Sequence, residues 1–180
     1  MAINYPDVIP MIAYEDGPKA MDWLSSAFGF KERARMLGKD GRLSHGEMEA
    51  GDGVIMLATP TPDYQAPRRH REACEPAQKW SAVPYIVDGV LVYVDDVDAH
   101  FAQAKQRGAS IISGIEADQY GRRYRAEDLE GHRWMFMQRE REVARPQSPE
   151  VFDRIARRPR ADLGEPAADL IKRERRVRAS

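Results

Sequence analysis

The chain has 180 residues, of which 42% are hydrophobic and 32% are charged, and its formal net charge is -1. A chain of this length can bury one sizeable core, and no apolar run approaches the roughly 18 residues needed to span a membrane. The first residues show no basic region followed by an apolar block, so no signal peptide is expected. The single cysteine, Cys74, excludes a disulfide framework and a cysteine-based zinc site, which favours a cytoplasmic protein.

The charge is distributed unevenly along the chain. Residues 139–180 carry 12 Lys and Arg against 8 Asp and Glu, whereas the part before them is acidic. A basic C-terminal extension is therefore predicted at residues 140–180, with short helices beginning at Pro149 and Pro166. Interspersed acids and few aromatic residues disfavour nucleic-acid binding. We expect this extension to pack on an acidic surface of its own chain or of a partner.

Residues 1–60 are predicted to form a strand, a helix and three further strands. A buried strand at 8–14 leads to Pro18, which suits the first turn of a helix, and Gly29 can end that helix in a left-handed conformation. A half-exposed strand at 31–37 precedes the strand that carries His45 and Glu47. A hairpin at residues 51–53 then leads into a strand at 54–58.

Residues 61–86 form a long connection that is rich in proline and contains a basic cluster at 68–71. We expect it to be irregular. Connections of this length are typically lids over a site or plain linkers, and both possibilities stay open. Trp80 and the tyrosines near it indicate packing against another part of the molecule.

Residues 87–139 repeat the order of the first 60 residues. A buried strand at 89–94 is followed by a helix that Asp95 and Asp96 begin, and then by strands at 109–112, 121–127 and 132–137. Residues 11–14 align with 91–94 at an offset of 80, and residues 55–57 align with 134–136 at an offset of 79. The sequence therefore predicts an internal duplication, and an α+β fold of two tandem βαβββ modules.

The repeated segments resemble the vicinal oxygen chelate superfamily, which includes glyoxalase I, bleomycin-resistance proteins and extradiol dioxygenases. The resemblance covers about residues 7–138 and implies a concave, cupped mixed sheet with helices on its outer face. Leu129 departs from the pattern, because proline is common at that position. The motifs that carry the resemblance are AMDWL at 20–24, FGF at 28–30, GRLSHGE at 41–47, GVIML at 53–57, YVDDVD at 93–98 and DLEGH at 128–132.

The resemblance also implies where metal ligands would lie, on the first and last strands of each module. The corresponding residues here are Ile9, Met56, Gly89 and Met135. None of them offers an imidazole or a carboxylate to a hard divalent ion. We therefore expect neither a metal nor another cofactor.

Strand alternation places a methionine-rich apolar trough on the inward face of the strands, adaptable to flat or apolar ligands. The alternative is that Met56 and Met135 fill a collapsed core. The candidate ligand-binding residues are Met11, Met56, Leu91, Tyr93, Met135, Met137 and, from the connection, Trp80. The opposite strand faces should pack under the helices as core, through Ile12, Ile55, Leu57, Val92, Trp134 and Phe136.

The favoured hypothesis is a homodimeric protein similar to the bleomycin-resistance branch, which binds a small, partly apolar or aromatic molecule without metal. The alternative is a lyase, isomerase or dioxygenase of the same superfamily. It would use His45 and Glu47, two residues apart on one strand face, as acid and base or around a relocated metal. Arg123, Arg125 and Glu127 also alternate along one strand face, as a contact to a ligand anion or as ordinary exposed strand charges.

Overall fold

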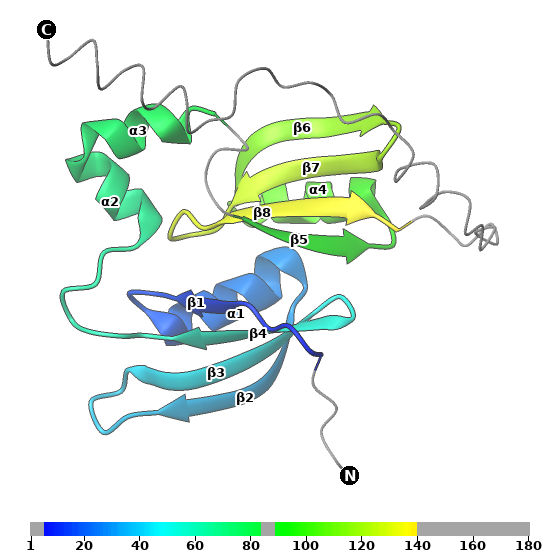
Figure 1. Cartoon of the computed structure of the whole chain (residues 1–180). Helices are drawn as coiled ribbons and strands as arrows, with labels where there is room; N and C mark the ends of the chain where they lie inside the picture. The colour runs from blue at the N-terminus through cyan, green and yellow to red at the C-terminus, as the bar shows by residue number, and fades with distance from the viewer. Residues whose placement is uncertain (1–5, 84–88, 140–180) are drawn as a thin grey trace, which may run out of the picture. The chain divides into compact units, whose positions relative to one another are not determined.

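The computed structural model describes residues 6–83 and 89–139. Within these residues the chain forms two modules, each with a four-stranded mixed sheet and a helix packed on one of its faces (Figure 1). The predicted α+β class and the repeated βαβββ order are confirmed. The helices expected at Pro149 and Pro166 lie outside the described residues.

Module 1 has the strand order β1-β4-β3-β2, in which β1 runs parallel to β4 and the other neighbours are antiparallel. The first strand is shorter than the sequence predicts, because only three of its residues pair with β4. The elements are β1 (Met11–Ala13), α1 (Gly17–Phe28), β2 (Lys31–Leu37), β3 (Leu43–Ala50) and β4 (Gly53–Ala58).

Module 2 repeats this arrangement with the order β5-β8-β7-β6, and β5 again runs parallel to the last strand. Strand β6 is longer than predicted, because its pairing with β7 continues beyond an irregularity in register after Ser113. The elements are β5 (Gly89–Val94), α4 (Val97–Gln106), β6 (Ser110–Asp118), β7 (Gly121–Glu127) and β8 (Arg133–Gln138).

The connection between the modules contains two short helices, α2 (Pro67–Ala73) and α3 (Glu75–Ser81). The expectation of an irregular segment is therefore wrong for these residues. Pro67 and Pro76 lie in first turns, where a residue without a backbone N–H costs no helical hydrogen bond. The prolines thus begin helices here. None of the helices in residues 6–83 and 89–139 is long and apolar enough to cross a membrane.

Both long helices begin, and α1 also ends, where the sequence predicts. The Asp16 carboxylate accepts a hydrogen bond from the backbone of Lys19 at 3.1 Å, and Asp96 accepts two at 3.0 Å from the first turn of α4. Gly29 ends α1 with a φ of 69°, which favours glycine.

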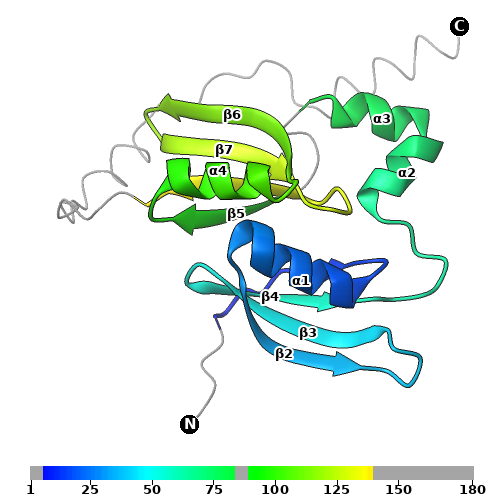
Figure 2. The same ribbon diagram turned by 180° about the vertical axis from the view of Figure 1, so that it is seen from behind.

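One hydrophobic core extends through both modules. Phe28 at the end of α1 lies 5.8 Å from the ring of Trp134 and 4.7 Å from that of Phe136, both on β8. Helices α1 and α4 contact each other, and Figure 2 shows each in front of its own sheet. Within the described residues, neither α1 nor α4 covers the other face of its sheet, which is here called the open face. The predicted core residues are confirmed, with Ile55, Leu57, Val92, Trp134 and Phe136 in the core and Ile12 packed against it.

A histidine in α4 also joins the modules through polar contacts. His100 Nε2 lies 3.1 Å from the carbonyl oxygen of Phe28, which can only accept, so this nitrogen carries a proton. His100 Nδ1 lies 2.6 Å from the hydroxyl of the buried Tyr124, which donates to it when the ring is neutral. Burial lowers the pKa of His100, although the Phe28 carbonyl opposes that shift. The neutral ring thus satisfies both neighbours.

A buried carboxylate at the turn between β7 and β8 makes the densest polar contacts of the core. Asp128 accepts hydrogen bonds from the Tyr14 hydroxyl at 2.7 Å and from the Trp134 indole at 3.1 Å. Its other oxygen accepts the backbone N–H groups of Glu130 and His132, both at 3.0 Å. Burial, reinforced by the Asp128 charge, raises the pKa of Tyr14, so its hydroxyl remains a donor.

Replacing Asp128 with alanine should leave these four donors without an acceptor and lower the free energy of unfolding by roughly 4 kcal/mol. The Tyr14→Phe variant removes one hydrogen bond to the same charge and should lose about 1.5–3 kcal/mol. Urea unfolding followed by tryptophan fluorescence measures both values. A loss below 1 kcal/mol in Asp128→Ala would show that the carboxylate does not hold the turn.

Candidate functional site

The open face of module 2 carries four of the predicted ligand-binding residues. Leu91 is paired with Met135, and Tyr93 with Met137, across the neighbouring strands β5 and β8. Leu91 is 41% exposed and Tyr93 is 47% exposed, whereas the alternate residues of the same strands belong to the core. The structure therefore brings these four side chains together on one exposed sheet face.

Charged side chains flank this apolar strip on β7. Arg125 is paired with Met135 and lies 3.3 Å from Glu116, and Arg123 lies 2.6 Å from Asp118. The Arg123 guanidinium lowers the pKa of Asp118 to about 2. Both guanidinium groups therefore bind carboxylates of β6. Both arginines also lie on the same face of β7, as the sequence predicts.

The open face of module 1 carries two further predicted ligand-binding residues and the predicted His45–Glu47 pair. Met11, 82% exposed, is paired with Met56, which is in turn paired with Glu47. His45 Nε2 lies 2.9 Å from Glu47 Oε1, with the His45 side chain 38% exposed and that of Glu47 10% exposed. The predicted His–Glu pair therefore exists, next to Met56 and on a different sheet from Tyr93.

The His45–Glu47 pair has the geometry of a histidine oriented by a carboxylate. When the neutral ring donates its Nε2 proton to Glu47, Nδ1 remains as an acceptor that can take up a proton. Within residues 6–83 and 89–139, no group of three or more His, Cys, Asp or Glu side chains could hold a metal ion. His132 does not join this pair, since its backbone binds Asp128 and its ring packs 4.6 Å from that of Tyr14.

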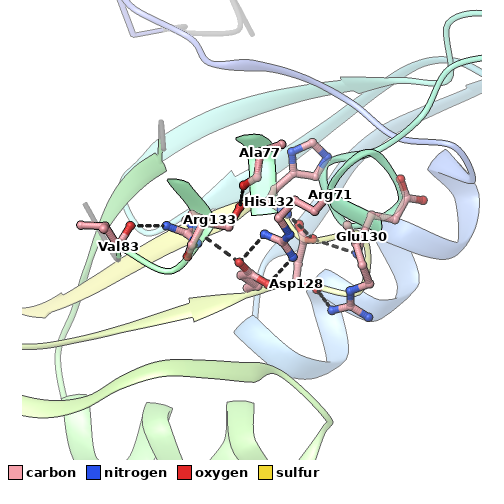
Figure 3. Close-up of polar contacts among 10 residues, drawn as sticks. Arg71, Ala77, Val83, Asp128, Glu130, His132 and Arg133 are labelled. Atoms are coloured by element: carbon pink, nitrogen blue, oxygen red, sulfur yellow. Dashed lines mark hydrogen bonds and ion pairs between the residues drawn. The ribbon is translucent and has the colours of Figure 1, made fainter. Parts of the chain in front are cut away.

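A network that the sequence does not predict ties the connection to the open face of module 2 (Figure 3). Glu127 on β7 accepts hydrogen bonds from Arg71 of α2 at 2.6 and 2.8 Å and from Arg133 of β8 at 3.2 Å. Arg133 also donates to the carbonyl oxygen of Val83 at 2.9 Å and to that of Ser81. Glu127 and Arg133 are buried. The sequence shows the basic cluster at 68–71 and Glu127, but no sequence pattern indicates that they pair.

This network borders the apolar strip. Glu127 and Arg133 are paired with each other, and each lies two residues from the next pair on the same face, Arg125 and Met135. A cavity of about 420 Å³ lies between α2, α3 and β7. Its lining consists of Arg68, Arg71, Glu72, Gln78, Ser81, Ala82 and Glu127. Trp80 is exposed on α3 and belongs to neither sheet face.

A family model described as the Glyoxalase/Bleomycin resistance protein/Dioxygenase superfamily matches residues 8–136. The chain belongs to this superfamily. The membership agrees with the duplicated fold and with the motifs that carry the resemblance. It leaves the reaction and the ligand open, because members of one fold host different chemistries.

Individual relatives extend the comparison. The uncharacterized protein Mb0911c of Mycobacterium bovis is 31% identical over 149 residues, which cover 79% of this chain and 90% of that protein. The crystal structure of TioX from Micromonospora sp. ML1 is similar with a TM-score of 0.55 and 29% identity, over 77% of this chain and 99% of TioX. UcmS2 has the same fold, with a TM-score of 0.52 and 16% identity over 76% of this chain and 98% of its own.

The four positions at which the superfamily resemblance implies metal ligands carry no imidazole or carboxylate side chain. Gly89 and Met135 lie on the neighbouring strands β5 and β8, and Met56 lies on β4 beside Met11. Ile9 precedes β1. Each module of this superfamily member thus presents a methionine on its last strand.

The connection is also held at the turn between β7 and β8. The Arg68 backbone N–H donates to the Glu130 carbonyl oxygen at 2.9 Å. The Arg68 guanidinium donates to the Asp128 carbonyl oxygen at 2.8 Å. Gly131 has a φ of 90°, and a Cβ there would lie 2.8 Å from the Arg68 nitrogen. Glycine is therefore needed both for the backbone conformation and for the close approach of α2.

The Gly131→Ala variant should push α2 away from module 2. Gly108→Ala is the matched control, because its φ of 86° imposes a similar strain while a Cβ there meets nothing within 4 Å. We expect trypsin to cut the native chain after Arg68, Arg69 or Arg71 about tenfold faster in Gly131→Ala than in the control. Equal rates in the two variants would contradict a close docking of α2 on the turn.

Proposed function

We propose that this superfamily member binds a small, partly apolar or aromatic molecule on its open sheet faces, without a metal. The observation that carries the proposal is the strip formed by Leu91, Tyr93, Met135 and Met137 on module 2. Strand alternation holds these side chains on the open face, because the residues between them are fixed in the core. Apolar side chains grouped in this way lose water when a ligand covers them.

The composition of the strip favours a flat ligand. Methionine side chains are flexible and polarizable, so Met135 and Met137 can adjust to a ring that lies on the sheet. Tyr93 adds an aromatic surface and a hydroxyl that can orient a polar group of the ligand. Arg139 lies 5.9 Å from the centre of the Tyr93 ring and supports its position at the end of the strip.

We also propose that the protein is a cytoplasmic homodimer. On module 1, Met11 and Met36 are large, exposed apolar side chains, which a second copy would remove from water. Light scattering coupled to gel filtration should give about twice the chain mass of 20.5 kDa. The mass of a single chain at micromolar concentration would contradict the dimer and leave ligand binding to be judged separately.

Titration with 8-anilinonaphthalene-1-sulfonate, a fluorescent aromatic probe, tests the strip. The Leu91→Glu variant should weaken binding roughly tenfold, because it replaces apolar contact area with a charge. Tyr93→Ser should weaken it about fivefold. The wild-type affinity should be the same with and without EDTA.

Leu37, an exposed leucine of module 1, supplies the matched control Leu37→Glu for Leu91→Glu. This control should bind the probe within about twofold of the wild type, as is usual for independent surface substitutions. Equal losses in Leu91→Glu and Leu37→Glu would place the probe elsewhere and contradict the proposed face.

A second candidate function is acid–base or metal-assisted catalysis at His45 and Glu47. The 2.9 Å contact between a half-exposed imidazole and a buried carboxylate, beside Met56 on an open face, supports it. Incubation with zinc, nickel, manganese or iron, followed by desalting and metal analysis, distinguishes the two functions. One metal retained per chain, and lost in His45→Asn, would favour the enzyme and contradict metal-free binding.

A further inference from the structure

We infer that the cavity beneath α2 and α3 is a polar subsite for the ligand of module 2, and that it takes a neutral carboxamide group. This inference rests on the proposed function, because it concerns the polar end of a molecule whose apolar part lies on the strip. The cavity and the strip are neighbours. Glu127 lines the cavity, and the next pair of residues on the same face is Arg125 and Met135.

The wall of the cavity is fixed before any ligand arrives. Glu127 is buried and accepts from Arg71 and Arg133, and Arg133 also donates to two carbonyl oxygens at the end of α3. Arg71 and Glu127 lie 56 residues apart in the chain, and Val83 and Arg133 lie 50 residues apart. Groups held by several partners keep their orientation, so they can recognise a ligand without first being ordered.

The guanidinium groups around the cavity are already engaged. The lining contains Arg68 and Arg71 beside Glu72 and Glu127, and Arg133 binds the same Glu127. Arg71 is bound through both its terminal nitrogens to Glu127, and Arg68 donates to the Asp128 carbonyl. An anion would compete with these partners for the guanidinium groups, and a cation would meet three guanidinium groups against two carboxylates.

The remaining polar groups suit a ligand that both donates and accepts. The Gln78 amide offers an N–H donor and a carbonyl acceptor. The Ser81 hydroxyl donates to the Ala77 carbonyl at 2.6 Å, so its oxygen is left to accept. A carboxamide presents the complementary pair, with N–H groups for the acceptors and an oxygen for the donor. Gln78 is exposed, so it can be changed without disturbing the core.

Four naphthalene compounds with the same ring test the subsite on the full chain. These are 2-naphthamide, 2-naphthoate, 2-naphthylmethylamine and 2-methylnaphthalene, with dissociation constants measured by fluorescence or by ligand-observed NMR. The amide should bind about fivefold more tightly than the other three, which corresponds to a net gain of one or two hydrogen bonds. The Gln78→Leu variant should remove that preference and leave the affinity for 2-methylnaphthalene unchanged. Gln106→Leu, on the exposed end of α4, should retain the preference.

The outcomes separate the two proposals. Equal affinity for all four compounds would overturn the subsite while the strip remains supported. Tighter binding of the carboxylate or the amine would show that the cavity takes an ion, which also overturns the subsite. An amide preference that persists in Gln78→Leu would place amide recognition elsewhere. If none of the four compounds binds, the apolar strip itself is not a ligand site and both proposals fail.

Discussion

The hydrogen bonds at the turn between β7 and β8 hold the rest of the structure in place. Asp128 is fully buried and binds the Tyr14 hydroxyl from module 1 and the Trp134 indole from the core of module 2. Two residues later, the Glu130 carboxylate accepts the backbone N–H groups of Glu15 at 2.7 Å and Asp16 at 3.0 Å, just before α1. Burial raises the pKa of Glu130, and these N–H groups partly offset that shift.

The same turn fixes the connection between the modules and, through it, the edge of the candidate site. Arg68 binds backbone oxygens of the turn, and Gly131 lets α2 approach closely. Once α2 lies there, Arg71 can reach Glu127, one residue before Asp128. The network that borders the open face is therefore an extension of the interactions that hold the modules together. A buried ion pair of this kind contributes little net stability, because its desolvation is costly. Its main structural effect is to position α2 and α3.

The sequence predicts the features that depend on local periodicity. Strand alternation identifies five residues of the core and Ile12, which packs against it, and the spacing of two residues places His45 and Glu47 on one face. It does not predict the helices of the connection, because Pro67 reads as a breaker until it is seen in a first turn. Nor does it pair Arg71 with Glu127, since these residues are 56 positions apart and no local pattern links them. Leu129, which stands where proline is common, packs against the core.

The duplication explains why the open faces differ while the cores match. In each module the core face must fit a helix, so alternate strand residues are constrained by packing. The residues on the open faces are not constrained by packing against a helix. At equivalent places in the two sheets, the pair Met56–Glu47 in module 1 corresponds to Met135–Arg125 in module 2. The methionine is shared, but the charged neighbour has opposite sign. Because the same fold accepts either charge beside the shared methionine, the fold alone does not determine what each open face binds. The side chains on the open faces therefore determine the specificity of the protein.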